Sequence, residues 1–157
     1  MRRRGRSCWH TPEEKAAFAH EKNERYLELL RTLPTVAVPD QTRSLLSTLR
    51  QRGYRLAVGS SSKNARAILD RIGLTAYFDA ISDGTGISRS KPDPEVFFNA
   101  ADLVGVEPSA CIVIEDARSG VMAARCVGMS VICIGDAATH RLGDTNIQTL
   151  TDLFTIL

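Results

Sequence analysis

The sequence predicts an α/β fold in which a parallel sheet carries helices on both faces. From residue 55 onward, short apolar segments alternate with amphipathic segments of helical length. Glycines that suit helix ends follow several of the amphipathic segments, at Gly53, Gly73 and Gly105. Polar residues follow the apolar segments directly, as they do where open α/β sheets bind ligands. Strands separated by helices of this length connect by right-handed crossovers, which gives a parallel sheet.

The N-terminal part of the chain differs from this pattern. Residues 1–10 have no periodicity, so we treat them as a separate segment. Thr11-Pro12-Glu13-Glu14 then predicts the start of a helix, with Thr as the cap, Pro at the first helical position and Glu three residues after the cap. This helix is expected to run to about Leu33. A linker bracketed by two prolines follows, and a second helix is expected at 42–52.

The remaining elements follow from apolar periodicity and from residues that begin or end helices. Asp93 is expected to cap a helix that has Pro94 at its first position. We expect strands at 55–59, 78–82, 111–114 and 130–134, and helices at 64–72, 94–104, 117–127 and 153–157.

The composition fits one domain with a small appendage and argues against two classes of partner. Hydrophobic residues make up 43% of the 157 residues, enough for a core. The chain has 20 basic and 18 acidic residues, and four of the basic ones are Arg2, Arg3, Arg4 and Arg6. The body is therefore nearly neutral and has no basic face for nucleic acid. No segment approaches the ~20 apolar residues of a membrane span.

The cysteines indicate a reducing compartment. The chain has four of them, none in CxxC spacing, and Cys111 and Cys133 lie inside apolar segments. Such usage is typical of reduced, cytoplasmic proteins. The histidines are scattered without a ligand partner at metal-site spacing.

A hydroxyl-rich turn follows the segment that ends at Gly59. The Ser60 hydroxyl and the next amides face the start of a helix, where unpaired N–H groups and the helix dipole favour anions. Ser62, Lys63 and Asn64 extend this polar surface. The alternative is that Ser60 is an ordinary helix N-cap.

An acidic pair follows the apolar segment Ile112-Val113-Ile114. A turn at the strand end could bring both Glu115 and Asp116 to one side. Mg²⁺ usually takes one or two carboxylates together with phosphate oxygens and water, so the pair suits this ion. Alternatively, the two acids only decorate a helix N-terminus.

Lys91 lies on a loop stiffened by Pro92 and by the helix start at Asp93-Pro94. Taken alone, a loop lysine is normally solvated. Combined with Ser60 and the acidic pair, it predicts a site for a phosphate beside a divalent cation. A phospho-receiver domain uses similar residues, but there the acids precede the lysine, the reverse of the order here.

These motifs together resemble the haloacid dehalogenase superfamily, and most closely its β-phosphoglucomutase branch. The resemblance rests on the strand that ends at Ser60, on Lys91-Pro92-Asp93-Pro94 and on Glu115-Asp116 followed by Gly120. The segments Ser60–Asn64 and Lys22–Tyr26 resemble phosphoglucomutases more than other phosphatases.

The resemblance implies a role for each matching position. Ser60 and Lys91 would hold the phosphoryl group that is transferred, and Glu115 and Asp116 would bind Mg²⁺. Lys22 would reach the active site from a partial helical cap at 11–36, above a core domain at 37–157. The second phosphate of the sugar would be contacted by Ser62, Lys63 and Asn64.

One family motif is missing. The Asp-x-Asp whose first Asp is the nucleophile and whose second is the general acid/base occurs nowhere in this chain. In the family it ends a strand that lies mid-sheet, between the strands ending at Ser60 and Glu115. We therefore expect an N-terminally truncated β-phosphoglucomutase-like chain, inactive alone and prone to self-association through exposed strand edges. A sugar-phosphate phosphatase and a non-catalytic protein that retains phosphate and Mg²⁺ binding remain the alternatives.

Overall fold

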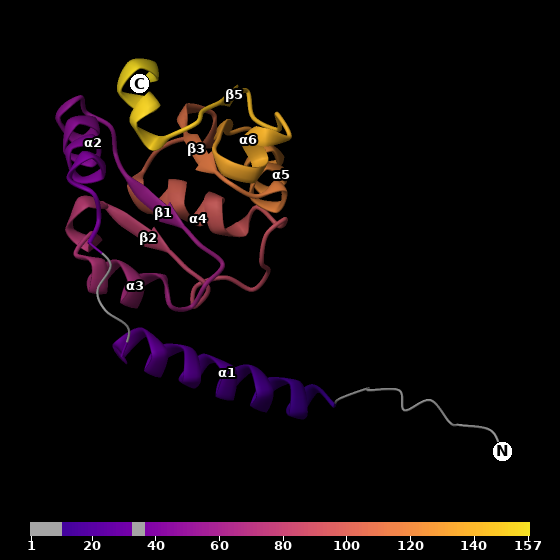
Figure 1. Cartoon of the computed structure of the whole chain (residues 1–157). Coiled ribbons are helices and arrows are strands. Elements are labelled where there is room, and N and C mark those ends of the chain that lie inside the picture. Colours follow the sequence, from indigo (N-terminus) through magenta and orange to yellow (C-terminus); the bar gives the residue numbers. More distant parts are fainter. Residues whose placement is uncertain (1–10, 33–36) are drawn as a thin grey trace. The chain divides into compact units, whose positions relative to one another are not determined.

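The computed structural model describes residues 11–32 and 37–157 (Figure 1). The chain divides into two compact units, Met1–Thr35 and Val36–Leu157. The separate segment expected at residues 1–10 lies outside the described residues. No helix within 11–32 and 37–157 combines the length and apolar character that a membrane crossing requires.

The described residues of the first unit form one helix, α1 (Pro12–Thr32), which begins as predicted. The Thr11 N–H donates to Glu14 Oε2 at 2.8 Å, and the Glu14 N–H donates to Thr11 Oγ1 at 3.2 Å. This reciprocal pair is the capping box that the sequence indicated. None of the residues of α1 is buried within the structure.

The second unit alternates strands and helices. The helices are α2 (Asp40–Gln51), α3 (Ala65–Ile72), α4 (Glu95–Val104), α5 (Arg118–Cys126), α6 (Gly135–Thr139) and α7 (Leu153–Ile156). The strands are β1 (Ala57–Gly59), β2 (Ala80–Ser82), β3 (Ile112–Glu115), β4 (Ser130–Cys133) and β5 (Thr145–Asn146). The sequence analysis did not predict α6 or β5.

The ends of two helices show how local chemistry sets the boundaries. Gly73 and Gly105 take left-handed conformations, with φ of 67° and 65°, and end α3 and α4 as predicted. The start of α4 differs by one residue from the prediction. Pro94 occupies the cap position, and Asp93 Oδ1 accepts the Glu95 N–H at 3.0 Å.

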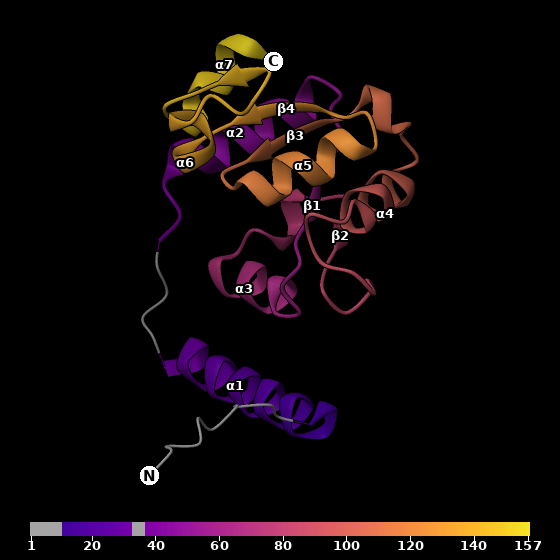
Figure 2. The ribbon, with the colours of Figure 1, turned by 90° about the vertical axis from the view of Figure 1, so that its right-hand side faces the viewer.

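The parallel sheet is divided into two parts. β1 pairs with β2, and β4 lies between β3 and β5; all three pairings are parallel. The parallel α/β arrangement is therefore confirmed, with helices around the strands (Figures 1 and 2). In the described part of the chain β1 and β3 do not pair, so the sheet has not closed by joining them.

Two apolar clusters form the core. One is built on β3, β4, α4 and α5, and contains Val96, Phe97, Val113, Val121 and Val131 among others. The other joins α2 to the C-terminal part of the chain, through Leu45, Leu49, Ile132, Ile147 and Leu153. Both clusters include residues of β4, which is the best buried strand.

Helix α2 contacts both parts of the divided sheet. Its apolar residues Leu45 and Leu49 belong to the cluster with β4. On its polar side, Arg50 Nη1 donates to Asp79 Oδ1 at 2.8 Å, just before β2. Arg43 donates to the carbonyl oxygens of Ile72 and Gly73 at 3.0 and 2.9 Å, at the end of α3. The helix therefore connects the two half-sheets.

Candidate functional site

The carboxyl ends of β1 and β3 meet at Lys91. The Lys91 backbone N–H donates to Ser61 Oγ at 3.3 Å, in the turn after β1. Its ammonium Nζ lies 2.7 Å from Oε2 of Glu115, the last residue of β3. One residue thus spans the gap between the two half-sheets, and the structure brings together Lys91, Glu115 and the turn after β1.

The lysine side chain is held on several sides. It is 17% exposed. Its ammonium lies 4.3 Å from the centroid of the Phe97 ring, within the range of a cation–π interaction. The peptide bond between Lys91 and Pro92 is cis. The contacts of its ammonium with Glu115 and Phe97 make Lys91 an oriented cation.

Glu115 is buried, and both oxygens of its carboxylate accept hydrogen bonds. Oε2 accepts the Lys91 ammonium, and Oε1 accepts the N–H groups of Asp116 and Ala117 at 3.1 and 3.2 Å. A Cβ on Gly120 would overlap this carboxylate. The spacing from Glu115 to Gly120 therefore has a physical reason: the first turn of α5 passes so close to the carboxylate that no side chain fits.

Asp116 has a different environment from its neighbour. It is exposed, and its carboxylate makes no hydrogen bond or ion pair within residues 11–32 and 37–157. Its carbonyl oxygen accepts the Ala137 N–H at 2.9 Å, which fixes the backbone. The two acids therefore have different environments: Glu115 supports the local structure, and Asp116 presents its oxygens to solvent.

The described residues contain no group of three or more metal-ligating side chains arranged around one point. The donor chemistry nevertheless fits Mg²⁺, which needs only one or two carboxylates beside phosphate and water oxygens. Asp116 offers unengaged oxygens. Glu115 keeps lone pairs, because a carboxylate has about four acceptor sites and three are used here.

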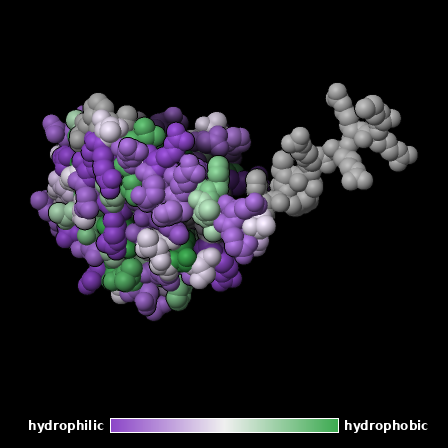
Figure 3. Space-filling model, turned by 90° about the horizontal axis from the view of Figure 1, so that it is seen from below, coloured by the Kyte–Doolittle hydropathy of each residue, from purple (hydrophilic) through white to green (hydrophobic). Residues whose placement is uncertain are grey.

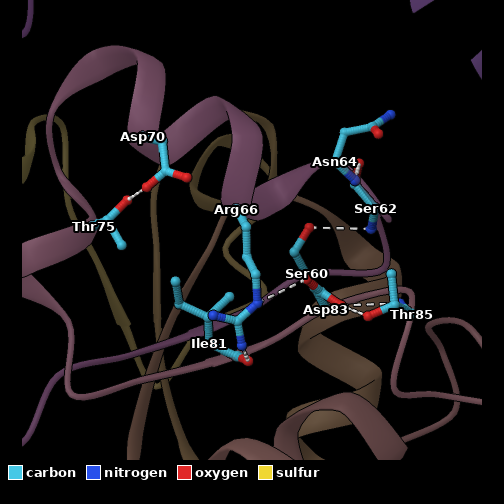
Figure 4. Close-up of polar contacts among 9 residues, drawn as sticks. All are labelled: Ser60, Ser62, Asn64, Arg66, Asp70, Thr75, Ile81, Asp83 and Thr85. Carbon is cyan, nitrogen blue, oxygen red and sulfur yellow. Dashed lines mark hydrogen bonds and ion pairs between the residues drawn. The ribbon is translucent and has the colours of Figure 1, made fainter. Parts of the chain in front are cut away.

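The serine-rich turn is shaped by its own hydroxyls (Figure 4). Ser60 Oγ accepts the Ser62 N–H at 3.1 Å, and Ser62 Oγ accepts the Asn64 N–H at 3.2 Å. The cap position of α3 is Asn64, so the alternative that Ser60 is an ordinary N-cap is wrong. Lys63 is exposed on the same turn.

The sequence analysis missed a buried acid behind this turn. Asp83 follows β2, is 4% exposed, and accepts the N–H of Thr85 at 2.9 Å; Arg66 Nε lies 3.5 Å away (Figure 4). Burial opposes ionisation, but the hydrogen bonds from Thr85 and the charge of Arg66 outweigh it and hold the pKa of Asp83 below its ordinary value. The signal was available, because Asp83 also follows a predicted strand.

The turn after β2 packs directly against the serine turn. The Gly84 N–H donates to the Ser62 carbonyl oxygen at 3.1 Å, and a Cβ on Gly84 would overlap the Ser61 carbonyl. The structure also reveals the contacts of Ser61 and Phe97 with Lys91, which the sequence did not indicate. Lys22 lies exposed on α1, in the other unit, and its role stays a prediction.

Comparison with known proteins identifies the family. The family model for haloacid dehalogenase-like hydrolases matches residues 4–128. The β-phosphoglucomutase of Bacillus subtilis is 34% identical over 150 residues, which cover 95% of this chain and 66% of the relative. The fructose-1-phosphate phosphatase YqaB of Escherichia coli is 36% identical, covering 74% of this chain and 61% of the relative.

Solved structures agree with this result. A crystal structure of β-phosphoglucomutase from Clostridium difficile superposes with a TM-score of 0.83 at 29% identity, covering 91% of this chain and 64% of that one. The chain belongs to the haloacid dehalogenase-like hydrolase family. Within it, the chain resembles both a sugar-phosphate mutase and sugar-phosphate phosphatases, and it spans 61 to 66% of the length of the two relatives described above.

Proposed function

We propose that this chain carries the phosphate- and Mg²⁺-binding groups of a β-phosphoglucomutase-like phosphotransferase. The parent reaction would interconvert β-glucose 1-phosphate and glucose 6-phosphate through an aspartyl phosphate. The observation that carries the proposal is the position of Lys91, an oriented cation between the turn after β1 and the acid that ends β3. Phosphoryl groups bind where such a cation and backbone N–H groups converge.

In this proposal each group has one task. Lys91 and Ser60 hold the phosphoryl group, and the exposed carboxylate of Asp116 is the main Mg²⁺ ligand, with Glu115 as its neighbour. When bound, Mg²⁺ would neutralise phosphate charge during transfer. Ser62, Lys63 and Asn64 contact the second phosphate, and Lys22 contributes from the partial cap.

A phosphatase is the second candidate, because relatives of both kinds match this chain. The fructose-1-phosphate phosphatase of E. coli and a phosphorylated carbohydrates phosphatase of Thermotoga maritima are 36 and 32% identical to it. In a phosphatase water accepts the phosphoryl group, whereas in a mutase the sugar keeps it. A protein that binds phosphate and Mg²⁺ without catalysis is the third candidate, since none of the 157 residues forms an Asp-x-Asp motif.

Binding of phosphate tests the proposed site directly. Titration calorimetry with inorganic phosphate and Mg²⁺ should show weak binding that Lys91→Gln reduces about tenfold, corresponding to ~1.4 kcal/mol. Glutamine keeps a hydrogen-bond donor, and circular dichroism checks that the variant is folded before its affinity is compared. Lys15→Ala, on α1, is the control and should bind like the parent chain. Equal affinity in Lys91→Gln and the parent would remove Lys91 from the site.

Turnover tests the catalytic part. The purified chain should neither isomerise β-glucose 1-phosphate nor release phosphate from it, because the covalent acceptor is absent from these 157 residues. Mg²⁺-dependent turnover that Asp116→Asn abolishes would show that another nucleophile exists. If the chain alone is inactive, as we expect, adding the part of the B. subtilis relative that this chain does not match should restore turnover. Isomerised hexose phosphate would support the mutase, and free phosphate the phosphatase.

A further inference from the structure

The surface that the proposed function leaves unused is mainly hydrophilic on the face drawn in Figure 3. Hydrophobic side chains form only small separate groups there, and scattered exposed hydrophobic residues need no partner. The informative groups are therefore polar ones that lie at the proposed site but have no task in it yet. Ser61 is such a group, because it lies between Ser60 and Ser62 in the turn after β1.

All three serine hydroxyls of this turn accept a backbone N–H group. Ser60 Oγ accepts the Ser62 N–H at 3.1 Å, and Ser62 Oγ accepts the Asn64 N–H at 3.2 Å. Ser61 Oγ accepts the Lys91 N–H at 3.3 Å. A hydroxyl group has one proton to donate beside its two acceptor lone pairs. In the part of the chain that the structure describes, none of the three hydroxyls donates to another protein group.

Ser61 differs from its two neighbours in what its hydroxyl connects. The hydroxyls of Ser60 and Ser62 accept N–H groups of the turn itself, whereas that of Ser61 holds the loop that carries Lys91, 30 residues further along. The turn after β2 packs against the Ser61 backbone, because a Cβ on Gly84 would overlap the Ser61 carbonyl oxygen. Ser61 is half-buried. Its hydroxyl is therefore fixed in place, and its proton is still available.

A phosphate bound at Lys91 would supply the acceptor that this proton lacks. The turn after β1 and the Lys91 loop meet at the Ser61 hydroxyl, so an anion held by both segments lies next to it. Phosphate oxygens accept hydrogen bonds, and bonds to a charged acceptor are stronger than those between neutral groups. The Lys91 N–H is already engaged by Ser61, so the hydroxyl is the donor that remains at this junction.

We propose that Ser61 is a further phosphate-binding residue, whose hydroxyl donates to an oxygen of the phosphoryl group that Lys91 and Ser60 hold. This role rests on the proposed function, because it requires a phosphate at the turn after β1. Ser61 then has two tasks, since its oxygen supports the Lys91 loop and its proton binds the ligand. The alternative is that Ser61 only supports the loop and affects phosphate through the Lys91 ammonium.

Substitution at position 61 measures the contribution of the hydroxyl. Inorganic phosphate is titrated with Mg²⁺ into the full chain and followed by phosphorus NMR. Ser61→Ala should weaken phosphate binding about tenfold, or ~1.4 kcal/mol. Ser61→Thr restores a hydroxyl and should bind within about threefold of the parent chain. Ser44→Ala, at an exposed serine on α2, is the control and should bind like the parent chain.

Circular dichroism checks that each variant is folded. If Ser61→Ala is not, Ser61→Cys takes its place, because a thiol has a similar size but is a weak donor.

A double-mutant cycle with Lys91→Gln separates direct binding from an effect through Lys91. If Ser61 donates to phosphate itself, Ser61→Ala should weaken binding about tenfold in the Lys91→Gln chain as well. If Ser61 only places the ammonium, its removal should change nothing once the ammonium is gone. A purely supporting role therefore predicts a different result from the proposed one.

Three results would overturn the proposal: parent-like affinity in Ser61→Ala, an equal loss in Ser61→Thr, or no further loss from Ser61→Ala in the Lys91→Gln chain. Weaker binding in Lys91→Gln but not in Ser61→Ala would overturn this proposal alone and leave the proposed function standing. A parent chain that binds no phosphate would overturn both.

Discussion

The two half-sheets are built on the same parallel principle but are packed differently. In β4 three of four residues are buried, including Val131 and Cys133 at 0% exposure. The strands β3 and β5 pair with its two edges. In β1 no residue is buried, and the strand lines a cavity of about 640 Å³ that β3 also borders. Burial of apolar area stabilises at about 25 cal/mol per Å². The core therefore centres on β4, whereas β1 is less well packed and is followed by the polar serine turn.

A buried charge should separate the two halves most clearly. Val131→Asp places a carboxylate in the core and should cost more than ~4 kcal/mol or prevent folding, whereas Val58→Asp, on half-buried β1, should cost about 1–2 kcal/mol. Urea unfolding followed by circular dichroism measures both values. Equal losses would mean that the halves are equally well packed.

The ion pair that joins the halves should have the next largest effect. Lys91→Met leaves the Glu115 side chain, 9% exposed, without its cation and should cost about 3–5 kcal/mol. The double variant Lys91→Met with Glu115→Gln should recover most of that loss. Lys63→Met, an exposed lysine on the serine turn, is the control and should change stability by less than ~0.5 kcal/mol. Additive losses in the double variant would show that the pair contributes nothing as a pair.

Gly120→Ala should give a smaller loss of about 1–3 kcal/mol, because the added Cβ overlaps the Glu115 carboxylate. Whether Gly120→Ala lowers or raises stability is informative. Alanine is otherwise the better helix former by about 1 kcal/mol, so a stabilised variant would show that the carboxylate moves aside freely. Thermal unfolding of Gly120→Ala beside Ser119→Ala, one residue earlier in α5, measures the difference.

The smallest effect should appear in how the free energy of unfolding falls at acid pH. The pKa of Asp83 is lowered by folding, so its contribution is present above its ordinary value near ~3.9 and is lost as pH falls through the lower folded value. Asp83→Asn should therefore reduce the loss of stability below about pH 4. Urea midpoints between pH 2.5 and 7 measure this. If Asp83→Asn loses as much stability at acid pH as the parent chain, other groups dominate that loss.

Local chemistry made most elements predictable. Thr11 and Glu14 specify a capping box, and Gly73 and Gly105 end helices, because each effect acts within a few residues. The convergence of Lys91 and Glu115 was predictable from the rule that parallel strands bring their carboxyl ends to one edge.

Effects between distant segments were not predictable in this way. The division of the sheet depends on pairing between strands more than 50 residues apart, and periodicity carries no information about it. Only the family resemblance, in which a mid-sheet strand is missing here, led us to expect open strand edges. The different environments of Glu115 and Asp116 depend on where Lys91 and Gly120 lie in space. The role of Lys22 depends on how two units are placed, and it remains a prediction.

The contacts of α2 have a consequence for the space between the half-sheets. The helix fixes one half through Leu45 and Leu49 and the other through Arg43 and Arg50. These contacts hold β1 and β3 at a set distance from each other. Because this spacing is set before anything enters the space, filling it would cost the chain little conformational freedom.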